Sequence, residues 1–129
     1  MNYSATTRAH FEAAARAGRL EGPDVVRGAA GSPEAGTWVQ FELRIRVDAA
    51  GRRTVSEARF LAFGCPHTIA AADWLAGEAS GAEPAAMLPE PVHAMQQRLD
   101  VPVEKLGRLL TVEDAWLAAM RAALAGPGF

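Results

Sequence analysis

A regular alternation of apolar and polar residues between positions 37 and 48 limits the possible folds more than any other feature of this sequence. Every second residue in the middle of TWVQFELRIRVD is apolar, namely Val39, Phe41, Leu43, Ile45 and Val47. The residues between them are Gln40, Glu42, Arg44 and Arg46. Because successive side chains of a β-strand point to opposite faces of a sheet, this pattern predicts a strand with one buried and one solvated face.

The segment that follows predicts the partner of this strand. DAAGRR, residues 48–53, has the composition of a turn, and TVSEARFLAF, residues 54–63, returns with Ala58, Phe60 and Ala62 on one face. Together they predict an antiparallel hairpin. The preceding RLEGPDVVRGAAGSPEAG is rich in glycine and contains two prolines, which favours a loop with one short edge strand over residues 24–28.

Helical periodicity marks the remaining segments. It predicts five helices, over residues 4–17, 66–77, 91–99, 103–110 and 112–124. We expect Ser4 or Thr6 to cap the first helix and Thr111 to cap the last. This order of elements predicts an α+β fold, in which helices pack on one face of a small antiparallel sheet of two or three strands. The length is that of a single domain, residues 1–129.

Charge and hydropathy exclude two classes of partner. The formal net charge is −2 with a pI near 5.9, and the basic residues are scattered along the chain, which argues against a nucleic-acid-binding protein. We find no apolar stretch of the length that a membrane span needs and no secretory signal pattern. We therefore expect a cytoplasmic protein that binds neither nucleic acid nor membrane.

The chain contains one cysteine, Cys65, so it cannot form an internal disulfide. Pro66 is the predicted first residue of a helix, which makes Cys65 its N-cap; there the unpaired N–H groups would lower the thiol pKa. His67 could hydrogen-bond the sulfur or join it as a metal ligand. A lone cysteine is also a common small apolar core residue, and the local residues leave both interpretations open.

We expect Glu34 and Asp73 to be solvated carboxylates.

Several strings resemble one protein family over nearly the whole chain. They are HFE at residues 10–12, GSPEAG at 31–36, EARFLAFGC at 57–65, TIAAADWLAG at 68–77 and VEDAWLAAM at 112–120. The chain resembles the U-type iron-sulfur cluster assembly scaffolds, the family of IscU and the NifU N-terminal domain. The glycine and cysteine at the strand end, followed by a helix of small residues, are the most specific part of this resemblance.

The resemblance also implies where a metal site would lie. In that family three cysteines and an aspartate from separate loops, often joined by a histidine, form a cluster or zinc site at one end of the molecule. Here Ala35 stands at the first cysteine, Thr37 at the aspartate, Gly107 at the histidine and Arg108 at the third cysteine, and only Cys65 is retained. Because thiolates hold such clusters, one thiol cannot complete the ligand set within one subunit.

Three interpretations follow from the resemblance. Cys65, with His67 beside it, could coordinate an iron-sulfur cluster, iron or zinc shared between two subunits, with a small thiol as a further ligand. Cys65 could instead accept persulfide sulfur from a cysteine desulfurase, with its thiolate stabilised by the helix terminus and by His67 or Arg108. The third interpretation is a partner-binding or regulatory module of the assembly machinery that has lost metal binding.

We therefore expect a non-enzymatic, scaffold-like protein of iron-sulfur cluster assembly that handles a cluster, iron or persulfide sulfur through Cys65. The expected partners are a cysteine desulfurase or other cluster assembly proteins, and the resemblance leaves a homodimer open.

Overall fold

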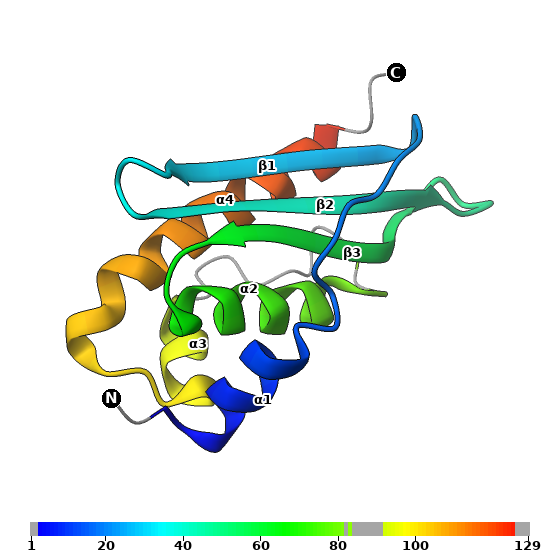
Figure 1. The fold of residues 1–129 in the computed structure, drawn as a ribbon. Coiled ribbons are helices and arrows are strands. Elements are labelled where there is room, and N and C mark those ends of the chain that lie inside the picture. Colours follow the sequence, from blue (N-terminus) through cyan, green and yellow to red (C-terminus); the bar gives the residue numbers. More distant parts are fainter. Residues whose placement is uncertain (1–2, 82, 84–91, 126–129) are drawn as a thin grey trace.

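The computed structural model describes residues 3–81, 83 and 92–125 and shows a three-stranded sheet with helices on one face (Figure 1). The strands are β1 (Val25–Ser32), β2 (Thr37–Val47) and β3 (Arg53–Phe63). The helices are α1 (Ala5–Ala13), α2 (Pro66–Ala79), α3 (Val92–Leu99) and α4 (Leu106–Ala125), and a 3₁₀ turn, η2 (Val103–Lys105), leads into α4. This arrangement confirms the predicted α+β fold.

The sheet has the order β1-β2-β3, and both neighbouring pairs are antiparallel. The alternating residues of β2 bury Val39, Phe41 and Leu43 completely, as the sequence pattern predicted. On this face α4 packs on β1 and β2, while α2 packs on β3. The ring of Phe41 meets the buried indole of Trp116 from α4 edge-on, with 5.6 Å between ring centroids. Burying one such side chain contributes about 1.5–3 kcal/mol to stability.

Helix α4 approaches the backbone of β1 directly at Gly28. A Cβ atom at this position would lie 2.1 Å from the backbone nitrogen of Ala119 and 2.5 Å from the carbonyl carbon of Ala118. No side chain fits in this gap. Because glycine has none, the helix and the strand can approach each other this closely at Gly28. On the helix side of this contact, Ala118 and Ala119 are also small, which allows the same close approach.

The opposite face of the sheet is crossed by the connection between α1 and β1, the blue segment that passes in front of β3 and β2 in Figure 1. The carboxylate of Glu42 is fully buried beneath it and accepts hydrogen bonds from the Leu20 amide (2.7 Å), Gln40 (2.8 Å) and Arg27 (3.2 Å). Burial alone raises the pKa of Glu42, but these donors outweigh it, so the pKa lies below its ordinary value. The prediction that Glu42 is solvated was therefore wrong.

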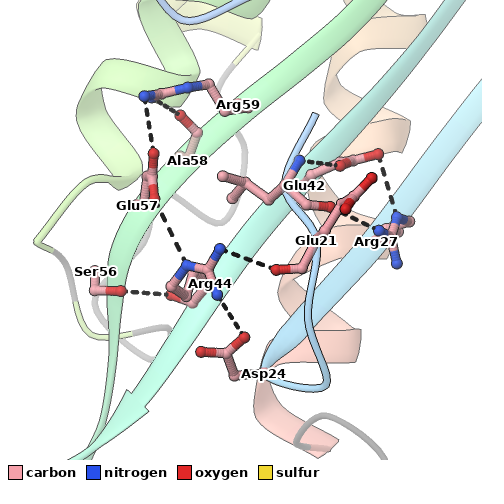
Figure 2. Close-up of polar contacts among 10 residues, drawn as sticks. Glu21, Asp24, Arg27, Glu42, Arg44, Ser56, Glu57, Ala58 and Arg59 are labelled. Atoms are coloured by element: carbon pink, nitrogen blue, oxygen red, sulfur yellow. Dashed lines mark hydrogen bonds and ion pairs between the residues drawn. The ribbon is translucent and has the colours of Figure 1, made fainter. Parts of the chain in front are cut away.

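A second polar group on this face is centred on Arg44. Figure 2 shows its guanidinium between two carboxylates, with 2.6 Å to Asp24 and 3.6 Å to Glu57. Arg44 also donates to the Glu21 carbonyl at 3.0 Å, which fixes the connection shortly before β1 begins. The connecting segment is thus held to the sheet by ionic and hydrogen-bonded contacts, whereas the helices are held to the other face by apolar packing.

The predicted short edge strand over residues 24–28 is too short, because β1 continues to Ser32. Glycine and proline content suggested a loop, but ladder pairing with β2 uses only backbone groups, and it continues through Gly31 opposite Trp38. The low strand propensity of glycine is overridden here by the close contact with α4.

Several predicted helix boundaries were also wrong. Helix α2 continues to Ala79 instead of ending at residue 77, and the helices predicted over 103–110 and 112–124 form the η2 turn and the single helix α4. The first helix ends at Ala13, with Ala14 in the left-handed conformation, because the backbone of Arg16 and Gly18 bonds to Phe60 at the edge of β3 instead. Thr111 is not an N-cap but lies inside α4, where its hydroxyl donates to the carbonyl of Gly107 at 3.5 Å. Ser4, one of the two predicted caps of α1, does accept from the Thr7 amide.

We expect Gly28→Ala to lower the free energy of unfolding by at least about 2 kcal/mol, because the new methyl group overlaps the backbone of α4. The matched control is Gly107→Ala, where the glycine is helical and no heavy atom from outside the local helix backbone lies within 4 Å of the added carbon. This control should gain about 0.5–1 kcal/mol. Urea titration of both variants measures the difference, and equal stability of the two would contradict the close contact.

Candidate functional site

Three chain segments that are distant in sequence meet at one end of the sheet. In the strand registers Ser32 lies opposite Thr37 and Trp38 lies opposite Phe63, so the β1–β2 turn and the end of β3 share this edge. Helix α4 runs antiparallel to β1, since a Cβ on Gly31 would lie 2.9 Å from the Thr111 side chain whereas Gly28 faces Ala119. The first turn of α4 therefore reaches the same end, as Figure 1 shows.

We refer to this region, residues 33–36, 64–68 and 103–108, as the Cys65 end. It contains Cys65, His67 and the family ligand positions Ala35, Gly107 and Arg108, whereas Thr37 begins β2 next to it and Asp73 lies further along α2. The arrangement brings Cys65 together with His67 and with the charge of Arg108, which influences the titration of both.

Cys65 is the N-cap of α2, as predicted, and Pro66 occupies the first turn. The preceding Gly64 has φ +155°, and a Cβ there would lie 3.0 Å from the Thr68 hydroxyl, so glycine makes this tight entry into the helix possible. The thiol is half-buried and lies 3.7 Å from the hydroxyl oxygen of Thr68. It is therefore neither a fully buried core residue nor a freely exposed one.

The surroundings of Cys65 favour the thiolate. Burial by itself raises the pKa of the thiol, but the backbone N–H groups of Thr68 and His67, the Thr68 hydroxyl and the charge of Arg108 lower it, and the net result is a lowered pKa. The N–H groups belong to the free N-terminus of α2, where no intrahelical acceptor is available. The thiolate is thus stabilised by this helix end and by one guanidinium.

His67 lies in the first turn of α2 with only 1% of its surface exposed. Its ring meets that of Tyr3 edge-on, with 4.8 Å between centroids, and its Nδ1 atom has no hydrogen-bond partner. Burial, followed by the charges of Lys105 and Arg108, lowers the pKa of His67, so the imidazole is neutral at pH 7.

Arg108 lies in the first turn of α4, and its Nε atom is buried without a hydrogen-bond partner. Within residues 3–81, 83 and 92–125, the Nε of Arg108 and the Nδ1 of His67 are the two buried side-chain polar atoms that lack a partner. Buried polar groups nearly always have partners, so each such atom needs an explanation. Both lie at the Cys65 end.

The remaining positions offer no ligand side chain. Ala35 is exposed in the β1–β2 turn, where its amide donates to the Ser32 hydroxyl, and Gly107 is exposed in α4. Thr37 is mostly buried and pairs with Ser32 in the sheet. In the described part of the chain no three His, Cys, Asp or Glu residues are grouped as a metal site requires. The residues present therefore do not fit a complete cluster site in one subunit.

Asp73 was expected to be solvated but is buried, with 1% of its surface exposed. Its carboxylate lies 2.6 Å from Nδ1 of His10 and accepts from the amide of Arg16 at 3.0 Å, so it joins α2 to α1 and to the connection after it. Its position among the buried alanines Ala70, Ala71 and Ala72 was a sign of this burial. Its partners, His10 and Arg16, are far from Asp73 in the sequence, so residue spacing could not predict them. Asp73 is a structural residue and is not directed to Cys65.

No helix in the described ranges has the length and apolarity to cross a membrane.

Comparisons with known proteins identify relatives of this chain and a similar fold. The family described as the NifU-like N-terminal domain matches residues 2–122. The nitrogen fixation protein NifU of Cereibacter sphaeroides is 41% identical over 112 residues, which cover 84% of this chain and 41% of NifU. The chain thus spans less than half the length of that relative.

A similar fold occurs in a solved structure from the thermophile Fervidobacterium islandicum AW-1, described as an iron-sulfur cluster assembly scaffold protein for the SUF system. The two chains superpose with a TM-score of 0.65 at 12% identity, covering 92% of this chain and 96% of the other. At this identity the likeness shows a shared fold.

We expect iodoacetamide to alkylate Cys65 at half its maximal rate at a pH below about 8.5, the pKa of a free cysteine. Because the pKa of the folded thiol is lowered, the thiolate persists to lower pH, and the rate should fall only as the pH drops through the folded pKa. Arg108→Gln should move the midpoint upward, and Arg121→Gln, at an exposed site later in α4, should not. A wild-type midpoint at or above that of a free cysteine would contradict the described surroundings.

Proposed function

The chain belongs to the NifU-like N-terminal domain family of iron-sulfur cluster assembly scaffolds, and we propose that it serves this assembly by carrying sulfur on Cys65. In this role a cysteine desulfurase supplies the sulfur, and the loaded chain passes it on without catalysing a reaction of its own. The observation that carries the proposal is the half-buried Cys65 thiol at the N-terminus of α2, whose pKa is lowered by this helix end and by the charge of Arg108.

The ligand inventory supports sulfur transfer over cluster binding by a single subunit. A two-iron cluster needs four protein-side bonds, most of them from thiolates, and this sequence supplies one thiol. Arg108 stands where the family has a cysteine, and its positive charge repels a metal cation while it attracts a thiolate. The same substitution that opposes metal binding therefore favours an anionic sulfur.

Sulfur transfer to Cys65 needs no oxidant. The Cys65 thiolate attacks the outer sulfur of a persulfide, R–S–SH, on the desulfurase and forms a new S–S bond. The S–S bond of the donor breaks, and its electron pair leaves with the inner sulfur as R–S⁻. The products are Cys65–S–SH and the donor thiolate, so atoms, charge and electrons balance. Arg108 and the N-terminus of α2 then face a persulfide in place of a thiolate.

A partner-binding module without thiol chemistry is the second candidate. It is favoured by the exposed apolar side chains around the Cys65 end, since Phe63, Val103 and Leu110 are 52%, 70% and 48% exposed. In that role the same surface contacts a partner, and Cys65 is dispensable.

The test is anaerobic incubation of the reduced protein with a cysteine desulfurase and cysteine, followed by intact mass measurement. We expect wild type to gain one sulfur atom and Cys65→Ser to gain none, because the chain has a single thiol. Arg108→Gln should load at least about tenfold more slowly, which corresponds to about 1.4 kcal/mol.

A parallel sample is reconstituted with iron, sulfide and a small thiol. Iron bound at about one pair per two subunits in wild type, and absent in Cys65→Ser, would replace sulfur transfer by a cluster shared in a dimer. If wild type takes up neither sulfur nor iron, the partner-binding module remains.

A further inference from the structure

The two unpartnered nitrogens at the Cys65 end point to a missing ligand. The Nε–H of Arg108 is a donor under all conditions, and Nδ1 of the neutral His67 donates in one of its tautomers. Every buried carboxylate described above has several donors around it, whereas these two buried nitrogens have no acceptor. An acceptor that is absent from the polypeptide would complete them.

The charges around these nitrogens select an anion. Arg108 and Lys105 both act on His67, and the free N–H groups at the start of α2 add a positive helix terminus. None of the ion pairs found among the described residues involves Arg108 or Lys105, although most of the other arginines have carboxylate partners. Lys105 and Arg108 thus have no carboxylate partner among these ion pairs, and the two carboxylates of the same region, Glu34 and Glu104, are both exposed.

We propose that the Cys65 end binds a small sulfur oxyanion with an S–S bond, such as thiosulfate, as a direct sulfur donor to Cys65. This inference rests on the proposed sulfur-carrying function and names a class of donor besides a protein persulfide. The oxygens of the anion accept from Arg108 and His67; the half-buried thiol lies two residues before His67, and the charge of Arg108 acts on it. The cations offset the repulsion between a thiolate and a dianion.

The transfer is balanced with thiosulfate as donor. The Cys65 thiolate attacks the outer sulfur of S–SO₃²⁻, and a Cys65–S–S⁻ persulfide forms. The S–S bond of thiosulfate breaks, and its electron pair leaves on sulfite, SO₃²⁻. One thiolate and one dianion give one persulfide anion and one dianion, so no further oxidant or reductant is needed.

The experiment incubates the reduced protein with thiosulfate and follows the intact mass and the sulfite released. We expect wild type to gain one sulfur atom and release about one equivalent of sulfite, faster than the same chain unfolded in urea. Cys65→Ser should show neither change. Arg108→Gln should react at least about tenfold more slowly, Arg108→Lys should recover part of the rate, and Arg121→Gln should match wild type. No gain of sulfur in wild type, or an unchanged rate in Arg108→Gln, would overturn the proposal.

A measurement on wild type alone covers the case in which Arg108→Gln does not fold. Sulfate, an oxyanion of the same charge that does not react with iodoacetamide, should slow alkylation of Cys65 relative to chloride at the same ionic strength. Equal rates would mean that the site has no place for the anion and would overturn the proposal.

The desulfurase assay separates this inference from the proposed function. Loading by the desulfurase but not by thiosulfate would overturn the small-anion donor and leave the sulfur-carrying function intact. Loading by thiosulfate but not by the desulfurase would support the anion site and remove the desulfurase as donor. Loading by neither would overturn both.

Discussion

The close contact between α4 and β1 determines where everything else lies in this protein. Gly28 lets the helix backbone reach the strand, and Trp116 then fills the space above Phe41 in the core. Because α4 runs antiparallel to β1, the contact also carries the first turn of the helix to the edge where β3 ends. Packing in the core thus brings Arg108 to the same end as Cys65, where its charge acts on the thiol, and a wider gap between α4 and β1 would weaken this effect.

Buried polar side-chain groups have hydrogen-bond partners in the described body of the molecule, whereas two of them at the Cys65 end have none. Glu42 and Asp73 are buried, but each is surrounded by donors and holds the chain between α1 and β1 in place. Buried carboxylates with a full set of partners are structural anchors. His67 and Arg108 carry buried nitrogens without partners, next to a thiol with a lowered pKa. Among the described residues, the buried polar atoms without partners thus lie at the end where the resemblance predicts ligands, which is consistent with a site that binds something other than a metal ion.

Several parts of this fold could be predicted from local sequence. The alternation in β2 predicted the buried face through Val39, Phe41 and Leu43, and Pro66 predicted the helix start at Cys65, because both depend on residues close together in the chain. The full length of β1, the burial of Glu42 and the burial of Asp73 could not be predicted, since their partners come from distant segments. The position of the site was predictable only through resemblance to a family. The roles of Cys65, His67 and Arg108 there remain predictions.

The sequence by itself determined the donor inventory, a single thiol, and the family resemblance predicts that Ala35, Thr37, Gly107 and Arg108 stand at the other ligand positions. It also determined the secondary structure around Cys65, because strand alternation and helix capping are local effects. Only the tertiary structure decided that Cys65 is half-buried, that the ring of His67 contacts that of Tyr3 and that the charge of Arg108 reaches the thiol. Burial and electrostatic interaction depend on distances in space, and the packing of α2 and α4 on one sheet sets those distances.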